Sequence, residues 1–224
     1  MRFLPTLLDQ ELDELLKKNL VPDDIRKATK NCCSAILILG QNQSVIKRAD
    51  LTRLTKSGTR NHRVNIAITH LANFELNKTL GMRLFESSDD KYLLVNSKIE
   101  YSEYFKHTPQ GSNEMVVLFF ILIIIFTSAE EKSSDSEIKN GLRALEYTDD
   151  ELKKIIETLV KKNYLTQSVQ QDEKLYSWGP RAVAETEPKN FFDTFLELAG
   201  EGKEDDWPEQ KRRIENLKKI HYRV

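Results

Sequence analysis

One stretch of the chain, residues 115–126, contains twelve apolar residues in succession and no polar one. A helix that is apolar on every side has to be buried on every side. Crossing a bilayer takes about 20 apolar residues, so this stretch is too short to span a membrane. The pattern therefore predicts a central core helix that the rest of its domain surrounds.

The chain before this stretch switches between helical and extended periods of apolar positions. Leucines at helical spacing predict an amphipathic helix within residues 1–24. The elements predicted next are helices at about 25–39, 47–55 and 61–80, a short extended piece at 44–46, and a strand–turn–strand at 82–96. Helix, short strand, two helices and a hairpin follow one another in the order of a winged helix.

The chain after residue 112 repeats that order. Its predicted elements are the apolar helix, a short helix at 136–145, a helix opened by a capping box from Thr148 to Glu151, a hairpin at 164–178 and one last helix at 181–198. Two segments with one element order predict a tandem repeat. We therefore expect a mainly α protein with small β-hairpins, in the α+β class, built from tandem winged-helix domains.

The expected domain boundaries follow changes in composition. The divisions are an N-terminal helix at 1–24, a first winged helix at 25–98, a hinge at 99–112, a second winged helix at 113–200 and a charged tail at 201–224. The hinge is polar and contains Pro109 and Gly111, which is typical of a linker.

Charge divides the chain in the same way. The formal net charge is −1, but residues 26–106 carry 14 Lys and Arg against 7 acidic residues, whereas residues 112–200 carry 10 against 16. Opposite charges on two halves predict domains with different partners, and the basic half is the better candidate for a polyanion.

Enzymatic chemistry finds no support in the sequence. The four histidines are scattered, glycines at phosphate-loop spacing are absent, and the only cysteines, Cys32 and Cys33, are adjacent. We therefore expect no catalytic residue, cofactor or metal. The first residues lack the long apolar stretch of a signal peptide, which predicts a cytosolic or nuclear protein.

Several short segments resemble the MAGE homology domain family. Residues 175–186, Leu-Tyr-Ser-Trp-Gly-Pro-Arg-Ala-Val-Ala-Glu-Thr, match its Trp-Gly-Pro-Arg-Ala-x-x-Glu-Thr signature. Residues 46–50, Ile-Lys-Arg-Ala-Asp, and residues 163–165, Asn-Tyr-Leu, match two further motifs, and residues 205–208 resemble a tail segment. The resemblance runs from about residue 25 to residue 208.

The resemblance implies a non-catalytic scaffold with two winged helices. Family members of this compact type bind a RING-type ubiquitin ligase and a kleisin, contact double-stranded DNA, and join an SMC pair indirectly in an SMC-five/six-type complex. The expected setting is DNA repair at nuclear chromosomes, with no contact to membranes. Two alternatives stay open: a standalone adaptor that regulates a RING ubiquitin ligase, and a tandem winged-helix transcription regulator.

The candidate RING-binding residues are Ile36 and Leu37. They fall where the family has a di-leucine, with Ala-Ile-Leu-Ile here for a pattern like Phe-Leu-Leu-Ile. Successive residues point about 100° apart on a helix, so at most one of the two can lie deep in the core stripe. The alternative is that both are core residues.

The candidate DNA-binding residues form a basic cluster with one acid, Asp50, among them. They are Lys47, Arg48, Arg53, Lys56, Arg60 and Arg63. In a winged helix the helix that follows this region enters the major groove, and phosphate contacts need only Lys and Arg. A solvated basic face is the alternative, and the second half offers Lys153, Lys154, Lys161 and Lys162 as a second candidate surface.

The candidate kleisin-binding residues are apolar side chains of the last predicted helix. They are Phe191, Phe192, Phe195 and Leu196. Four large apolar residues exceed what one small core face needs, so some of them are expected to line a groove for an amphipathic helix. The alternative is that they cover the apolar helix at 115–126.

Overall fold

The computed structural model describes residues 22–42, 45–55, 62–88, 90–96, 114–200 and 206–221. The chain divides into two compact units, Met1–Ser97 and Lys98–Val224. The expected amphipathic helix at the N-terminus and the expected hinge lie outside the described residues, apart from the first residues of α2.

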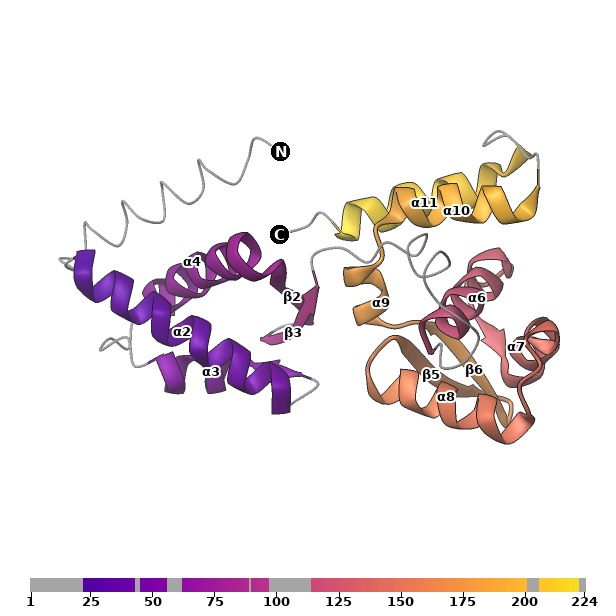
Figure 1. The fold of residues 1–224 in the computed structure, drawn as a ribbon, viewed down its shortest axis with the longest axis horizontal. Helices are drawn as coiled ribbons and strands as arrows, with labels where there is room; N and C mark the ends of the chain where they lie inside the picture. The colour runs from indigo at the N-terminus through magenta and orange to yellow at the C-terminus, as the bar shows by residue number, and fades with distance from the viewer. Residues whose placement is uncertain are drawn as a thin grey trace. The chain divides into compact units, whose positions relative to one another are not determined.

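Unit 1 has the element order expected of a winged helix (Figure 1). Its elements are α2 (Pro22–Asn42), β1 (Ile46–Lys47), α3 (Arg48–Thr55), α4 (His62–Leu80), β2 (Met82–Ser88) and β3 (Lys91–Asn96). The strands form an antiparallel sheet in the order β1-β3-β2. One stripe of α2 supplies much of the core, and Gly40 lets this helix approach β3, because a Cβ there would lie 2.5 Å from Leu94 Cδ2.

Unit 2 repeats the arrangement. Its elements are α6 (Glu114–Thr127), β4 (Ser133–Ser134), α7 (Asp135–Gly141), a 3-10 turn (Arg143–Leu145), α8 (Asp149–Lys161), β5 (Leu165–Gln170) and β6 (Glu173–Trp178). The sheet order is β4-β6-β5, which matches that of unit 1 position by position. The capping box at Thr148 and Glu151 is confirmed, and Ser134 and Glu137 form another that opens α7.

The end of unit 2 differs from the sequence prediction. The single helix expected at 181–198 is two helices, α9 (Pro180–Glu185) and α10 (Pro188–Ala199). Pro188 explains the break, because proline has no N–H to donate and disfavours helical backbone in the residue before it. Glu187 instead caps α10 by accepting a hydrogen bond from the Asn190 N–H at 2.7 Å.

The apolar helix α6 is the centre of unit 2, but one of its faces is not fully covered. Val117, Leu118, Phe119, Ile121, Leu122, Ile125 and Phe126 are buried. The remaining face, with Val116, Phe120, Ile123 and Ile124, is half-buried. The expectation of burial on every side therefore holds for most of this helix and fails along one stripe.

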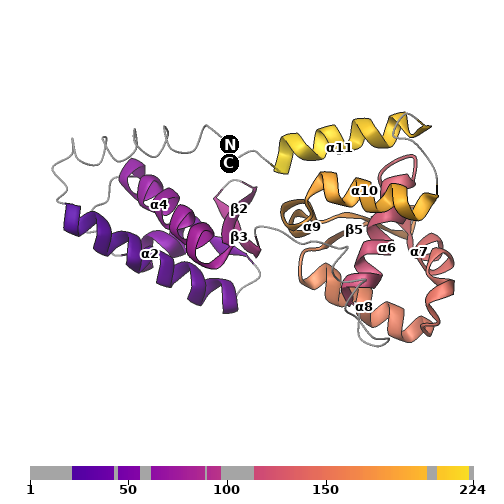
Figure 2. The same ribbon diagram turned by 45° about the horizontal axis from the view of Figure 1, so that its top comes forward.

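The stretch expected as a charged tail contains a further helix, α11 (Pro208–His221). Figures 1 and 2 show it beside α10, and it also contacts α6 and α9. The Arg213 guanidinium, 4% exposed, donates to the carbonyl of Phe126 in the last turn of α6 and to those of Ser128 and Ala129, which follow the helix. Carbonyls in the last turn of a helix have no N–H partner within it, so Arg213 acts as a cap supplied from the far end of the chain.

Taken separately, the two units confirm the predicted fold class, mostly helical with small antiparallel sheets and tandem winged-helix units. Among the described residues, no helix is both long enough and apolar enough to cross a membrane.

Candidate functional site

The Trp-Gly-Pro-Arg segment joins three elements of unit 2. The Trp178 indole N–H donates to the Leu122 carbonyl of α6 at 3.1 Å. The indole ring meets Phe191 of α10 edge-on, with centroids 4.9 Å apart. Trp178 is thus a packing residue whose N–H bonds to a carbonyl 56 residues away in the chain.

Gly179 is required by a close approach of two backbones. A Cβ at this position would lie 2.3 Å from the Asn163 carbonyl oxygen. The Gly179 N–H donates to the Tyr164 carbonyl at 2.8 Å, and the Arg181 N–H donates to the Asn163 carbonyl at 3.0 Å. The segment thereby fastens the start of α9 to the start of β5.

A buried carboxylate completes this junction. Glu185 is 1% exposed, accepts a hydrogen bond from the Tyr164 hydroxyl, and lies 3.6 Å from the Arg181 guanidinium. Burial raises the pKa of Tyr164, and the Glu185 charge raises it further. The hydroxyl is thus held protonated as a donor, which fits a structural role for the signature.

The two residues of α2 expected to bind a RING partner lie on different sides of the helix. Ile36 is fully buried in the unit 1 core, so its assignment as a contact residue is wrong in this fold. Leu37 is half-buried beside that core, and Ile38 is 57% exposed. Leu37 and Ile38 therefore form the apolar surface here, and the exposed Ile38 is a residue that the sequence analysis missed.

Cys33 lies one helical turn before Leu37 on α2, and its side chain faces α4. The Cys33 thiol lies 3.6 Å from the Ala72 carbonyl of α4, as a donor to it. Burial raises the pKa of this thiol to about 11, so it stays protonated near neutral pH.

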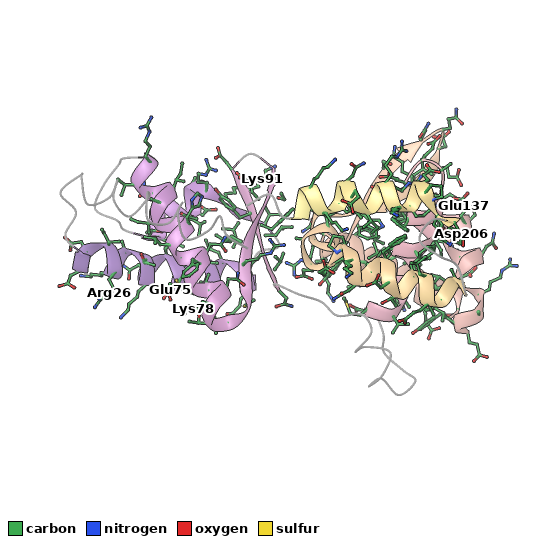
Figure 3. All side chains as sticks on the ribbon, turned by 90° about the horizontal axis from the view of Figure 1, so that it is seen from above. Arg26, Glu75, Lys78, Lys91, Glu137 and Asp206 are labelled. Atoms are coloured by element: carbon green, nitrogen blue, oxygen red, sulfur yellow. The ribbon has the colours of Figure 1, made fainter. Side chains whose placement is uncertain are left out.

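Among the charged residues of this unit, Figure 3 shows Arg26 on α2 and Glu75 and Lys78 on α4, all three exposed.

The predicted basic cluster is divided by the fold. Arg48 is engaged by the hairpin, since its guanidinium lies 3.0 Å from Glu86 and 2.6 Å from Asp90 and donates to the Tyr92 hydroxyl at 2.8 Å. The fold therefore uses Arg48 to hold α3 against β2 and β3, which speaks against a role in DNA contact.

Three other members of the cluster are exposed. They are Lys47 on β1, Arg53 on α3 and Arg63 in the first turn of α4. Arg53 also pairs with Asp50 at 3.2 Å within its own helix. Lys56 and Arg60 lie outside the described residues.

The aromatic residues of α10 are part of the unit 2 core. Phe191, Phe192 and Phe195 are at most 4% exposed, and all three rings contact Phe126 of α6, with centroids 5.4 to 6.3 Å apart. Trp207, which precedes α11, meets Phe195 edge-on at 5.1 Å. In the described part of unit 2 these rings therefore floor no exposed groove, because α6 and the α11 segment cover them.

The outer side of α10 has different residues. Leu196 is half-buried and Leu198 is 54% exposed. Of the four predicted contact residues, Leu196 alone keeps a substantial accessible surface, and Leu198 is an exposed neighbour that the sequence analysis did not select.

The described residues also bear on metal chemistry. In the ranges that the structure describes, no group of three or more His, Cys, Asp or Glu side chains is placed to hold a metal ion.

Comparisons with known proteins place the chain among its relatives. The model of the MAGE homology domain matches residues 86–189. A chain from a solved structure titled "Nse1-Nse3-Nse4 complex" is similar to this one with a TM-score of 0.65 and 21% sequence identity, over 88% of this chain and 100% of that chain. A search of curated proteins finds no match.

These findings agree with the geometry. The matched residues run from β2 through the hairpin β5–β6 and the Trp-Gly-Pro-Arg segment to the start of α10. The resemblance to the MAGE homology domain family that the sequence motifs predict is thereby confirmed.

Proposed function

We propose that this protein is a non-catalytic subunit of a complex like the Nse1-Nse3-Nse4 complex, most like its Nse3 member (non-SMC element three). The observation that carries this proposal is the similarity of fold to a chain of that complex, over 88% of this chain and 100% of that one. By analogy the partners are a RING-type ubiquitin ligase and a kleisin, with an SMC pair and nuclear chromosomes as the setting.

The RING partner is assigned to the apolar surface of α2. Leu37 is half-buried and Ile38 is exposed, so both can lose solvent contact on binding without disturbing the core. Protein interfaces are commonly anchored by a few such residues with a polar rim around them. Here Ser34 and Gln41, both exposed on the same side of α2, supply that rim.

The kleisin is assigned to the outer side of α10. Leu196 and Leu198 are accessible, and the buried rings of Phe192 and Phe195 give this helix a rigid support. An amphipathic helix of the partner would bury the two leucines, in the helix-in-groove mode.

The DNA contact is assigned to the exposed cations of unit 1. Lys47, Arg53 and Arg63 are all exposed, and residues 26–106 carry the positive surplus of the chain. Phosphate contacts supply affinity without sequence preference, so this surface suits a scaffold better than a sequence-specific transcription regulator.

The test is co-purification followed by mass spectrometry, with the tagged full-length protein as bait. We expect a RING protein and a kleisin together. Ile38→Asp should remove the RING protein and leave the kleisin, whereas Leu198→Asp should do the reverse, because distant sites act independently. Glu75→Lys, an exposed change on α4, is the matched control.

Two results would overturn the proposal. A RING protein captured without a kleisin or any SMC protein would favour the standalone ligase adaptor. Loss of neither partner with either variant would show that both surfaces are wrongly assigned.

A further inference from the structure

The last helix of unit 2 differs in charge from the rest of that unit. Helix α11 carries five Lys and Arg residues against two Glu. Each of the described α-helices from α6 to α10 has at least as many acidic as basic residues. Among the described α-helices of unit 2, a positive surplus is therefore confined to α11, which lies beyond the segment that matches the family model.

The positive side chains lie on the outer side of α11. Gln210, Arg213 and Ile214 are buried and Leu217 is half-buried, which fixes the inner face. Arg212 and Lys219 lie on the opposite side, and their neighbours Lys211, exposed, and Lys218, half-buried, lie at its edge, which gives two cation pairs at adjacent positions. The pairs are seven residues apart, so about 10 Å separates them along the helix. We call these four residues the α11 ridge.

Both acids of α11 lie beside cations of the α11 ridge. Glu209 is 3.9 Å from the Arg212 guanidinium. Glu215 lies 2.6 Å from the Lys218 ammonium group. Its pKa is lowered by Lys218 first and then by the charges of Lys219 and Lys211, so these three ammonium groups lie around one exposed carboxylate. The ridge therefore keeps a net positive charge at neutral pH. Figure 3 shows side chains standing out from α11 on the side away from α10.

The ridge is held in a fixed place on unit 2. Besides its three bonds to the carbonyls that end α6, Arg213 pairs with Glu209 at 2.9 Å and with Glu131 at 3.3 Å. Trp207, the residue directly before α11, packs edge-on against Phe195. A cation array that is fixed before binding loses less conformational freedom when it meets its ligand.

We propose that the α11 ridge binds the phosphate backbone of double-stranded DNA, as a second contact separate from the cations of unit 1. Its outer face exposes charged and polar residues and no large apolar side chain between them, whereas protein interfaces have an apolar or aromatic centre. Phosphate contacts need only Lys and Arg, and duplex DNA offers one negative charge for about every 1.7 Å of its axis. The inference deepens the DNA-binding part of the proposed function and rests on it for the choice of ligand.

The experiment measures binding of a fluorescent 30-base-pair duplex to the full-length protein across a range of salt concentrations. The ridge variant is Arg212→Glu with Lys219→Glu. The comparison variant in unit 1 is Lys47→Glu with Arg63→Glu, and the control is Arg143→Glu with Lys174→Glu, at two exposed cations of unit 2 that belong to neither candidate surface. All six residues are exposed, so the melting temperature should not change.

The ridge variant should bind DNA more weakly, and its salt slope should fall by about 1.8, since each phosphate contact contributes about 0.9. The Arg143 and Lys174 control should bind like the unchanged protein. An unchanged affinity and slope in the ridge variant would overturn the proposal, even if the unit 1 variant loses binding as the proposed function expects. Loss in the ridge variant alone would support the ridge and refute the DNA surface of unit 1.

An acidic partner protein is the competing ligand. A poly-glutamate peptide measured in parallel separates the two. If the ridge variant lost the peptide but kept its affinity for the duplex, the ridge would be a surface for acidic proteins and the DNA assignment would be wrong.

Discussion

Helices α2 and α6 occupy the same position in the two winged-helix units, yet they differ in how much of their surface is buried. α2 buries one stripe, with Ile36 at its centre, and leaves Ile38 and its charged residues in water. α6 buries most of its circumference, and the segment from β6 to α11 packs around it. The same order of elements thus gives a first helix with an exposed outer side in unit 1 and a first helix surrounded by additional elements in unit 2.

The sheets show that this difference lies in the side chains and not in the backbone plan. In each unit a two-residue strand pairs with the last strand of the hairpin, and both sheets are antiparallel. A repeat can therefore keep its topology while the apolar positions on its first helix decide what is added outside.

The largest expected effect comes from removing an aromatic ring at the centre of unit 2. Phe191→Ala should lower the free energy of unfolding by about 3–5 kcal/mol, because Phe191 is fully buried against Phe119, Phe126 and Trp178. Both tryptophans, Trp178 and Trp207, are in unit 2, so tryptophan fluorescence during denaturation reports on this unit alone. Phe74→Ala, at a residue 40% exposed on α4, is the control and should leave that transition in place.

The next effect separates two neighbours on α2. Ile36→Ala should cost about 2–5 kcal/mol, whereas Ile38→Ala should stay within about 0.5 kcal/mol, since the first is fully buried and the second is 57% exposed. Hydrogen exchange of the α2 amides measures both changes in unit 1. Equal losses of protection would mean that the core register described for α2 is wrong.

A smaller effect is expected at the attachment of α11. Arg213→Met keeps much of the side-chain volume but leaves the carbonyls that end α6 without their donor, at a cost of about 1–3 kcal/mol. Amides of α11 should exchange faster while those of α8 keep their protection. If α11 stayed fully protected, Ile214 and Trp207 would be sufficient to hold it.

The smallest effect is a dependence on alkaline pH. The pKa of Tyr164 is raised in the folded state, so its protonated form is the favoured one there. Its contribution to stability is complete below the unfolded pKa of about 10 and is lost as pH rises above that value, by at most about 1.4 kcal/mol per pH unit. Denaturation between pH 9 and pH 11 measures the slope for unit 2.

Tyr164→Phe is the matched variant for this measurement. It removes the ionisable hydroxyl and should flatten the slope, at the cost of leaving Glu185 without one of its donors. A slope that is unchanged by the substitution would assign the alkaline sensitivity to another group.

The sequence was sufficient for the local elements and insufficient for contacts between distant segments. Periodicity and turn residues predicted both hairpins, the order of helices and the capping box at Thr148, because these depend on neighbours along the chain. Periodicity places Ile36 in the core stripe of α2, but which of Leu37 and Ile38 is more accessible depends on how α2 meets β3 and α4.

The candidate site shows the same limit more clearly. An excess of aromatic residues on α10 was a sound reason to expect a groove, but Trp207, twelve residues beyond Phe195, covers one of them. The stretch that contains α11 is rich in charged residues, and a core contact such as that of Ile214 is hard to recognise among them from the sequence. Only the folded chain shows that Arg213 is part of the interior.

The cap on α6 also has a consequence for synthesis. Arg213 follows Phe126 by 87 residues, so at about 5–20 residues per second the ribosome makes the end of α6 roughly 4 to 17 s before the residue that caps it. During that interval the nascent second unit has its central helix without its final cover. A chaperone that recognises apolar surface would bind the nascent unit 2 while α6 is uncapped. An mRNA truncated before the codon for residue 213 would produce a chain in which α6 is never capped.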